Sequence, residues 1–215
     1  KVWKGLASKG QMPIRLNSFV LVDAGQGVHG AAAYYKAMEK KYSTERLRVP
    51  GVKMFMDGVI EYPAQTAALI DPYLEKVGDE WVPGSNRGDI YFTQKQANRF
   101  VTRFDRMNRR IHVHAIGDRA AKVALNAAAA ARKANRSARR DNIAIAHLQL
   151  VDPSDYGRFA KLGVYADMQL QWAVSDFWTE DALHPFVGDE RYNRLYPARS
   201  LVKAGAPFAM GSDWP

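Results

Sequence analysis

Short apolar segments alternate with helix-like segments along the whole of this 215-residue chain. The segments that we expect to be strands lie at residues 13–23, 51–58, 110–117, 141–151, 164–172 and 206–213. Regular alternation of strands and helices predicts a parallel β/α architecture, which can be either a closed barrel or an open, doubly wound sheet. This alternation limits the fold more strongly than any other feature of the sequence.

Polar side chains near the ends of these strands favour the barrel. Lys53, His114, His147 and Asp213 follow apolar residues in the second, third, fourth and sixth expected strands. Groups so far apart in sequence can share one site if successive strands end on a common rim, as they do in a (β/α) barrel. An open sheet would instead gather its ligands at a single switch point.

Residue periodicity and end signals predict the main helices. Thr93 and Gln96 form a capping-box pattern, and apolar residues follow at helical spacing. Asp118 is the expected N-cap of an alanine-rich helix that runs to about residue 133, and Asp152 and Gly163 bound another helix. Both faces of residues 51–58 are largely apolar, which predicts a strand buried on both sides. Residues 59–91 are rich in proline, glycine and aromatics, and predict a long loop that covers the site.

Composition removes several classes of function. The chain has 31 basic and 22 acidic residues, but its densest basic stretch, residues 132–140, lacks interleaved aromatics, so we expect a solvated helix end and no nucleic-acid partner. Without cysteine, any metal must bind nitrogen and oxygen ligands. No apolar run is long enough for a membrane span. The sequence does not determine the cellular compartment, because the amino-terminus of the parent protein is not represented. A cytoplasmic location is slightly favoured.

Four segments resemble, in order, the metal-dependent amidohydrolase superfamily, and specifically its YtcJ-like branch. They are VKMFMDG, HVHAIGDRA, AHLQLVDPSD and LVKAGAPFAMGSDWP. The resemblance implies a TIM (β/α)8-type barrel with one or two divalent metal ions at its rim and hydrolysis mostly of C–N bonds. It also implies that Lys53 lies on the fourth barrel strand, His114 on the fifth, His147 on the sixth and Asp213 on the eighth.

The residue types suit that chemistry. Imidazole and carboxylate groups bind Zn and similar ions, so zinc is the expected metal, and Lys53 can be a ligand only if its charge is removed, for instance by carbamylation. By resemblance, Asp213 is the catalytic base that takes a proton from water and returns it to the leaving nitrogen. Lys53 can alternatively pair with Asp57. Asp57, Asp118 and Trp172 are further candidates for supporting a ligand or contacting a small amide-like substrate.

The chain departs from the superfamily pattern in one respect. An H-x-H pair is expected on the first barrel strand, and none precedes Lys53; His112 and His114 have that spacing on another strand. We therefore expect residues 1–215 to be part of a single barrel domain with about six of its eight strands, without the first strands and the small β-sandwich domain. Such a fragment should bind metal poorly and be inactive alone. Homo-oligomerisation stays open.

A glycine-rich loop provides the alternative function. Gly25, Gly27 and Gly30 form G-x-G-x-x-G between an expected strand and an expected helix, with Glu45 twenty residues after Gly25. This pattern is typical of a dinucleotide-binding α/β protein. Against it, Glu45 lies in a polar stretch instead of at a strand end, and the histidines and Asp213 would have no role.

Overall fold

The computed structural model describes residues 2–135 and 141–213, so residues 136–140 at the end of the basic stretch lie outside the described residues. In chain order the strands and α-helices are α1 (Val2–Ser8), β1 (Leu16–Asn17), β2 (Val20–Leu21), α2 (Gly27–Tyr42), β3 (Leu47–Arg48), β4 (Gly51–Phe55), β5 (Leu74–Val77), β6 (Glu80–Pro83), α3 (Gln94–Arg106), β7 (Arg110–Ala115), α4 (Asp118–Asn135), β8 (Ile143–His147), α5 (Tyr156–Leu162), β9 (Val164–Met168), α6 (Phe177–Glu180), α7 (His184–Tyr192), α8 (Ala198–Lys203) and β10 (Phe208–Met210).

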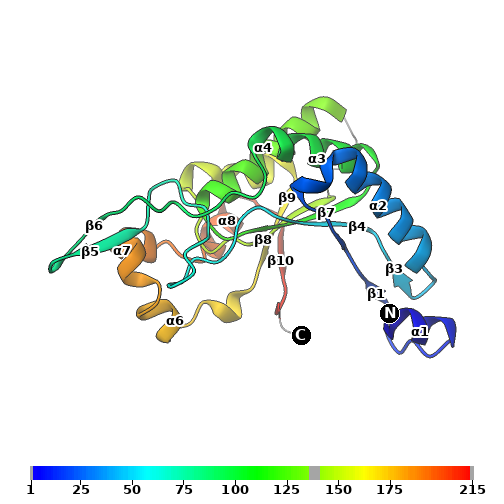
Figure 1. The fold of residues 1–215 in the computed structure, drawn as a ribbon, viewed down its shortest axis with the longest axis horizontal. Coiled ribbons are helices and arrows are strands. Elements are labelled where there is room, and N and C mark those ends of the chain that lie inside the picture. Colours follow the sequence, from blue (N-terminus) through cyan, green and yellow to red (C-terminus); the bar gives the residue numbers. More distant parts are fainter. Residues whose placement is uncertain (1, 136–140, 214–215) are drawn as a thin grey trace.

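The central sheet has six strands in the order β2-β4-β7-β8-β9-β10, and every neighbouring pair is parallel. Spatial order follows chain order without a reversal, and α2, α3 and α4 lie on one side of the strands (Figure 1). A doubly wound sheet reverses its order at the nucleotide site. The doubly wound alternative is therefore wrong, and the expected incomplete barrel is confirmed as an arc whose edge strands β2 and β10 are not paired with each other within the described residues.

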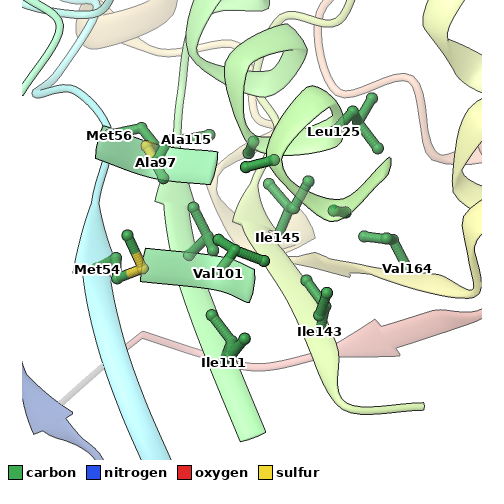
Figure 2. Packing of buried hydrophobic residues seen from close by; sticks show 14 of the residues in the cluster. Met54, Met56, Ala97, Val101, Ile111, Ala115, Leu125, Ile143, Ile145 and Val164 are labelled. Carbon is green, nitrogen blue, oxygen red and sulfur yellow. The ribbon is translucent and has the colours of Figure 1, made fainter. Parts of the chain in front are cut away.

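The core fills the space between this arc and its helices. One face of the sheet presents Val52, Met54, Ile111 and Ile145, all buried, to apolar residues of α3 and α4 such as Val101 (Figure 2). Burying each side chain of this size contributes about 1.5–3 kcal/mol. The carboxyl ends of the strands are thereby held in fixed positions.

Two helix predictions are confirmed at their ends. Thr93 caps α3 by accepting a hydrogen bond from the backbone N–H of Gln96, whose side chain accepts one from the N–H of Thr93. Asp152 caps the short 3-10 turn before α5, and Gly163 ends α5 in the left-handed conformation. These local signals could be read correctly because each depends on neighbouring residues only.

The opposite face of the sheet is only partly buried, which corrects the expectation for residues 51–58. Leu21 is 56% exposed and Phe55 is 38% exposed, although both stand on central-sheet strands. The arc does not close within the described residues, so this face has no strands across from it. Strand β4 is therefore covered on one side only.

Two further expectations need correction. The strand expected at residues 13–23 is divided, because β1 pairs with β3 in a separate two-stranded sheet while β2 pairs with β4. The loop expected at residues 59–91 contains the antiparallel hairpin β5–β6, which turns at Gly78 with a positive φ of 63°. The hairpin extends to one end of the molecule (Figure 1).

Among residues 2–135 and 141–213, no helix combines the length and apolarity that crossing a membrane requires.

Candidate metal centre

The two histidines at strand ends lie next to each other. Phe55 of β4 is in register with His114 of β7, and Ala115 of β7 is in register with His147 of β8. The imidazole rings of His114 and His147 meet edge to face, with 4.5 Å between their centroids. Residues that are 33 positions apart in sequence therefore form a pair, as the shared rim of a barrel requires.

His114 is held in a form that can bind a metal. Its Nε2 lies 2.9 Å from the carbonyl oxygen of Gly58, which can only accept, so Nε2 carries the proton and Nδ1 has the lone pair. Burial lowers the pKa of His114 to about 4, although the hydrogen bond to Gly58 acts in the opposite direction. A neutral imidazole whose second nitrogen donates to a carbonyl is the usual arrangement of a metal-binding histidine.

His147 combines burial with an uncommon backbone conformation. Burial, followed by the nearby His114, lowers its pKa to about 3. Its φ is 75°, in the left-handed region that few non-glycine residues adopt. The backbone N–H of His147 donates to Oε1 of Gln169 over 3.0 Å. Backbone strain of this kind is found most often at functional sites, where the surroundings hold it in place.

Lys53 stands on β4 beside the histidine pair. Burial lowers its pKa to about 8, and the carboxylates of Asp213 and Asp167 act in the opposite direction. Its Nζ lies 5.1 Å from the centroid of the Phe55 ring. An amine with this pKa is neutral in an appreciable fraction of molecules at neutral pH, which is the form that can react with carbon dioxide.

Asp57 is buried behind His114 and makes no ion pair with Lys53. Its carboxylate accepts three backbone hydrogen bonds, from Ile116 over 3.0 Å and from Gly117 and Ala68 over 2.9 Å each. Its Oδ1 is also 3.7 Å from Nε2 of His114. Asp57 therefore links the loop after β4 to the turn after β7. His114 lies near the end of β7, so the same contacts hold its strand end in place.

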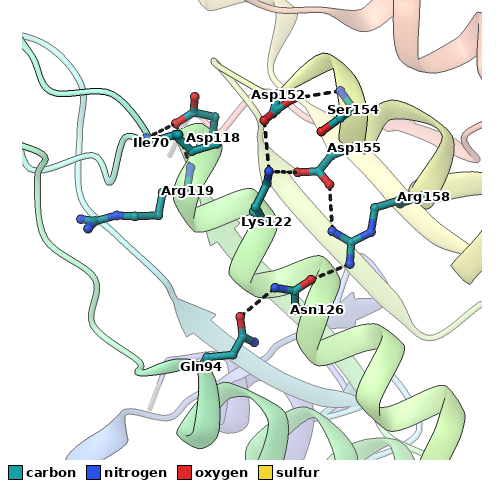
Figure 3. A network of polar contacts seen from close by, with 10 residues as sticks. All are labelled: Ile70, Gln94, Asp118, Arg119, Lys122, Asn126, Asp152, Ser154, Asp155 and Arg158. Atoms are coloured by element: carbon teal, nitrogen blue, oxygen red, sulfur yellow. Dashed lines mark hydrogen bonds and ion pairs between the residues drawn. The ribbon is translucent and has the colours of Figure 1, made fainter.

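The other candidates lie at different depths. Asp213 is exposed, has a φ of 52°, and lines the same cavity as His114 and His147. Trp172 also lines this cavity. Asp118 is the first residue of α4, and its Oδ1 accepts hydrogen bonds from the backbone N–H groups of Ile70 and Arg119 over 2.7 and 2.8 Å (Figure 3). Those contacts connect α4 to the loop after β4 and do not reach a histidine.

The donors suit a divalent ion in their chemistry, although they do not form a closed shell. Two neutral imidazoles and a carboxylate line one cavity, and a lysine of lowered pKa lies on the neighbouring strand β4. Across the two described ranges, however, no three His, Asp or Glu side chains are close enough together to hold an ion unaided. The described residues thus bring together fewer donors than a closed coordination shell needs.

The cavity has a volume of about 440 Å³ and is formed by loops that follow the strands. Its lining includes Glu61, Gln149, Gln169 and Tyr196, none of which the sequence singled out. Gln149 stands two residues after His147, so the same strand-end argument could have identified it. Glu61 and Tyr196 come from irregular segments, whose position depends on packing far along the chain.

A second polar pair lies deeper in the arc. His112 is in register with Lys53 and contacts Oδ2 of Asp167 on β9 through its Nε2, over 3.0 Å. The sequence indicated only the spacing of His112 from His114 and did not identify this partner. Strand alternation could have done so, because Asp167 takes the same face of its strand as His112.

An arc of parallel strands with histidines and carboxylates at its carboxyl ends is the arrangement of a β/α barrel whose site lies on the rim. The profile of the Amidohydrolase family matches residues 1–215, and the chain therefore belongs to this family. The resemblance seen in the sequence, including its YtcJ-like character, is confirmed.

Individual proteins with similar sequences or structures are consistent with this family. The exoenzymes regulatory protein AepA of Pectobacterium carotovorum is 28% identical over 93% of this chain and 40% of its own length. The putative amidohydrolase YtcJ of Bacillus subtilis is 26% identical over 100% of this chain and 36% of its own length. A solved structure of an uncharacterised metal-dependent hydrolase from Pyrococcus horikoshii is 25% identical, with a TM-score of 0.72 over 98% of this chain and 38% of that structure. The chain thus spans about two fifths of these proteins.

Proposed function

We propose that this chain is the metal-binding and substrate-binding part of a hydrolase that cleaves C–N bonds in small amide, cyclic amide or formamide-like molecules. The observation that carries the proposal is the edge-to-face pair of neutral histidines, His114 and His147, at the carboxyl ends of neighbouring strands in one cavity with Asp213. Membership of the Amidohydrolase family supports the same reaction class.

Each strand-end residue has a role in this proposal. His114 and His147 bind one or two divalent ions, of which zinc fits imidazole and carboxylate donors best. When bound, the ion polarises the substrate carbonyl and acidifies a water. Asp213 accepts the proton from that water and returns it to the leaving nitrogen.

Lys53 joins this donor set after carbamylation. Its neutral amine forms a new N–C bond with carbon dioxide and releases a proton, which converts the side chain to an anionic carbamate. The lowered pKa of Lys53 favours this step because it raises the fraction of neutral amine. The carbamate oxygens are then ligands of the same type as a carboxylate.

Residues 1–215 alone should be inactive. No H-x-H pair precedes Lys53, and no complete cluster of His, Asp and Glu donors forms among the described side chains. We infer that the remaining ligands belong to the first barrel strands of the full-length protein. Weak metal binding by the chain itself should still depend on the residues named above.

Zinc affinity tests the proposal directly. We expect His114→Ala, His147→Ala and Asp213→Ala each to weaken Zn²⁺ binding by about tenfold or more, measured in competition with a chromophoric chelator. His184→Ala is the matched control, because His184 is on α7 and does not line the cavity. Unchanged affinity in all three cavity variants would refute the site.

A further inference from the structure

The cavity that contains the histidine pair has an acidic lining. Glu61, Asp176 and Asp213 line it, whereas no lysine or arginine does so among the described residues. This contrasts with the whole chain, whose formal net charge is +9. The sign of the charge around the cavity is therefore a local property, opposite to the general field of the protein.

Glu61 is the carboxylate of this set that remains for a ligand. Oδ1 of Asp176 accepts hydrogen bonds from the backbone N–H groups of Trp178 and Thr179, over 2.9 and 3.1 Å, and caps α6. Asp213 belongs to the proposed metal centre. Oε1 of Glu61 accepts one hydrogen bond from Gln149, and its Oε2 accepts none within the described part of the chain.

Gln149 and Tyr196 hold Glu61 in position. Nε2 of Gln149 donates to Oε1 of Glu61 over 3.0 Å and to the hydroxyl of Tyr196 over 2.8 Å. The backbone N–H of Tyr196 donates in turn to the carbonyl of Gln149 over 2.8 Å. Gln149 is only 6% exposed, so its side chain has little freedom to move. A carboxylate fixed in this way loses little entropy when it binds a cation.

Aromatic side chains line the same cavity as this carboxylate. Tyr62, Trp172 and Trp178 line the cavity, and the Tyr62 ring is stacked on Phe186 with 4.8 Å between the centroids. Aromatic faces attract ammonium and guanidinium groups by their quadrupoles, and they also pack against flat apolar groups. A carboxylate among aromatic rings is a combination that recognises organic cations.

We propose that Glu61 is a specificity residue which binds a cationic group, an ammonium, amidinium or guanidinium, on the substrate. The proposal rests on the proposed function, since it assigns the non-reacting end of the substrate to the cavity of the histidine pair. It predicts that cationic amides are preferred over neutral amides of the same shape, and that anionic ones are rejected.

Three probes of nearly identical shape test this proposal without metal or turnover. Benzamidine, benzamide and benzoate carry charges of +1, 0 and −1, and each is small enough for a cavity of about 440 Å³. Binding to the metal-free chain is measured by ligand-observed NMR titration at about 0.15 M salt, where the general field is screened. We expect benzamidine to bind at least about tenfold more tightly than benzamide. A difference of this size corresponds to the free energy of one hydrogen bond to a charged group.

Glu61→Gln should bring benzamidine to within about twofold of benzamide while leaving benzamide binding unchanged, which also shows that the variant folds. Glu80→Gln, an exposed change of the same charge on β6, should leave the preference intact. A preference for benzamide or benzoate, or a benzamidine preference that survives Glu61→Gln, would overturn the proposal. Because the titration contains no zinc, a negative result would count against the role of Glu61 without bearing on the proposed metal site.

Discussion

Burial is the largest cause of the shifted pKa values of the two histidines and of the ionisable side chains near them. Burial lowers the pKa of His114, His147 and Lys53, and raises that of Asp57 to about 7 in spite of three backbone N–H donors. The first three residues are thereby brought towards the neutral, electron-donating forms that bind metals or react with carbon dioxide. A buried group with a shifted pKa in a cavity is typical of a functional site.

Asp57 provides a prediction at this scale. Asp57→Asn replaces one acceptor oxygen by an NH2 group, so at least one N–H group loses its partner: that of Ile116 if Oδ1 is replaced, or those of Ala68 and Gly117 if Oδ2 is replaced. We expect the free energy of unfolding to fall by about 1–3 kcal/mol. The measurement is urea denaturation at pH 8, above the pKa of Asp57. Asp71→Asn is the matched control, and an equal loss of stability in that exposed position would contradict the role of Asp57.

Among the secondary-structure elements, α3 and α4 form the helical layer that supports the site. Nη1 of Arg132 on α4 lies 2.6 Å from Oδ1 of Asp105 on α3, and both side chains are buried. Asn142, immediately before β8, also donates to Oδ1 of Asp105 over 3.0 Å. This cluster connects both helices to the start of the strand that ends at His147. A second network of Lys122, Asp155 and Arg158 connects α4 to α5 (Figure 3).

Removal of the Asp105 side chain should therefore lower the stability of the fold. Asp105→Ala takes the carboxylate away from the buried guanidinium of Arg132, and breaking a buried pair in this way costs about 3–5 kcal/mol. We expect a corresponding drop in the free energy of unfolding, measured by urea denaturation. Asp79→Ala, in the exposed turn of the β5–β6 hairpin, should change stability by less than about 0.5 kcal/mol. Similar stability of the two variants would contradict this account.

Elements with local signals could be predicted from the sequence, whereas those that depend on distant partners could not. The Thr93 cap and the six strands of the sheet were predictable because periodicity and capping involve neighbouring residues. The hairpin β5–β6 was missed because its glycines and prolines are also typical of loops. Glu61 and Tyr196 reach the cavity through contacts with Gln149, 88 and 47 residues away, which no local pattern records.

At the scale of the whole molecule, the chain spans about two fifths of the length of the relatives that it resembles. The arc of six parallel strands places His114, His147 and Asp213 around one cavity, and Phe55 beside it is 38% exposed. Fold and family follow from sequential strand order and from the match over residues 1–215. The described residues therefore contain a preformed histidine pair, whereas we propose that activity needs the full-length protein.

Anomalous diffraction from zinc-soaked crystals of the chain gives the sharpest test of the proposed metal centre, because it locates the ion. We expect an anomalous peak in the cavity, within about 2.0–2.1 Å of Nδ1 of His114 and of one ring nitrogen of His147. Zinc found only at other histidines, such as His29 or His184, with no peak between His114 and His147, would contradict the assignment of a metal centre to these strand ends.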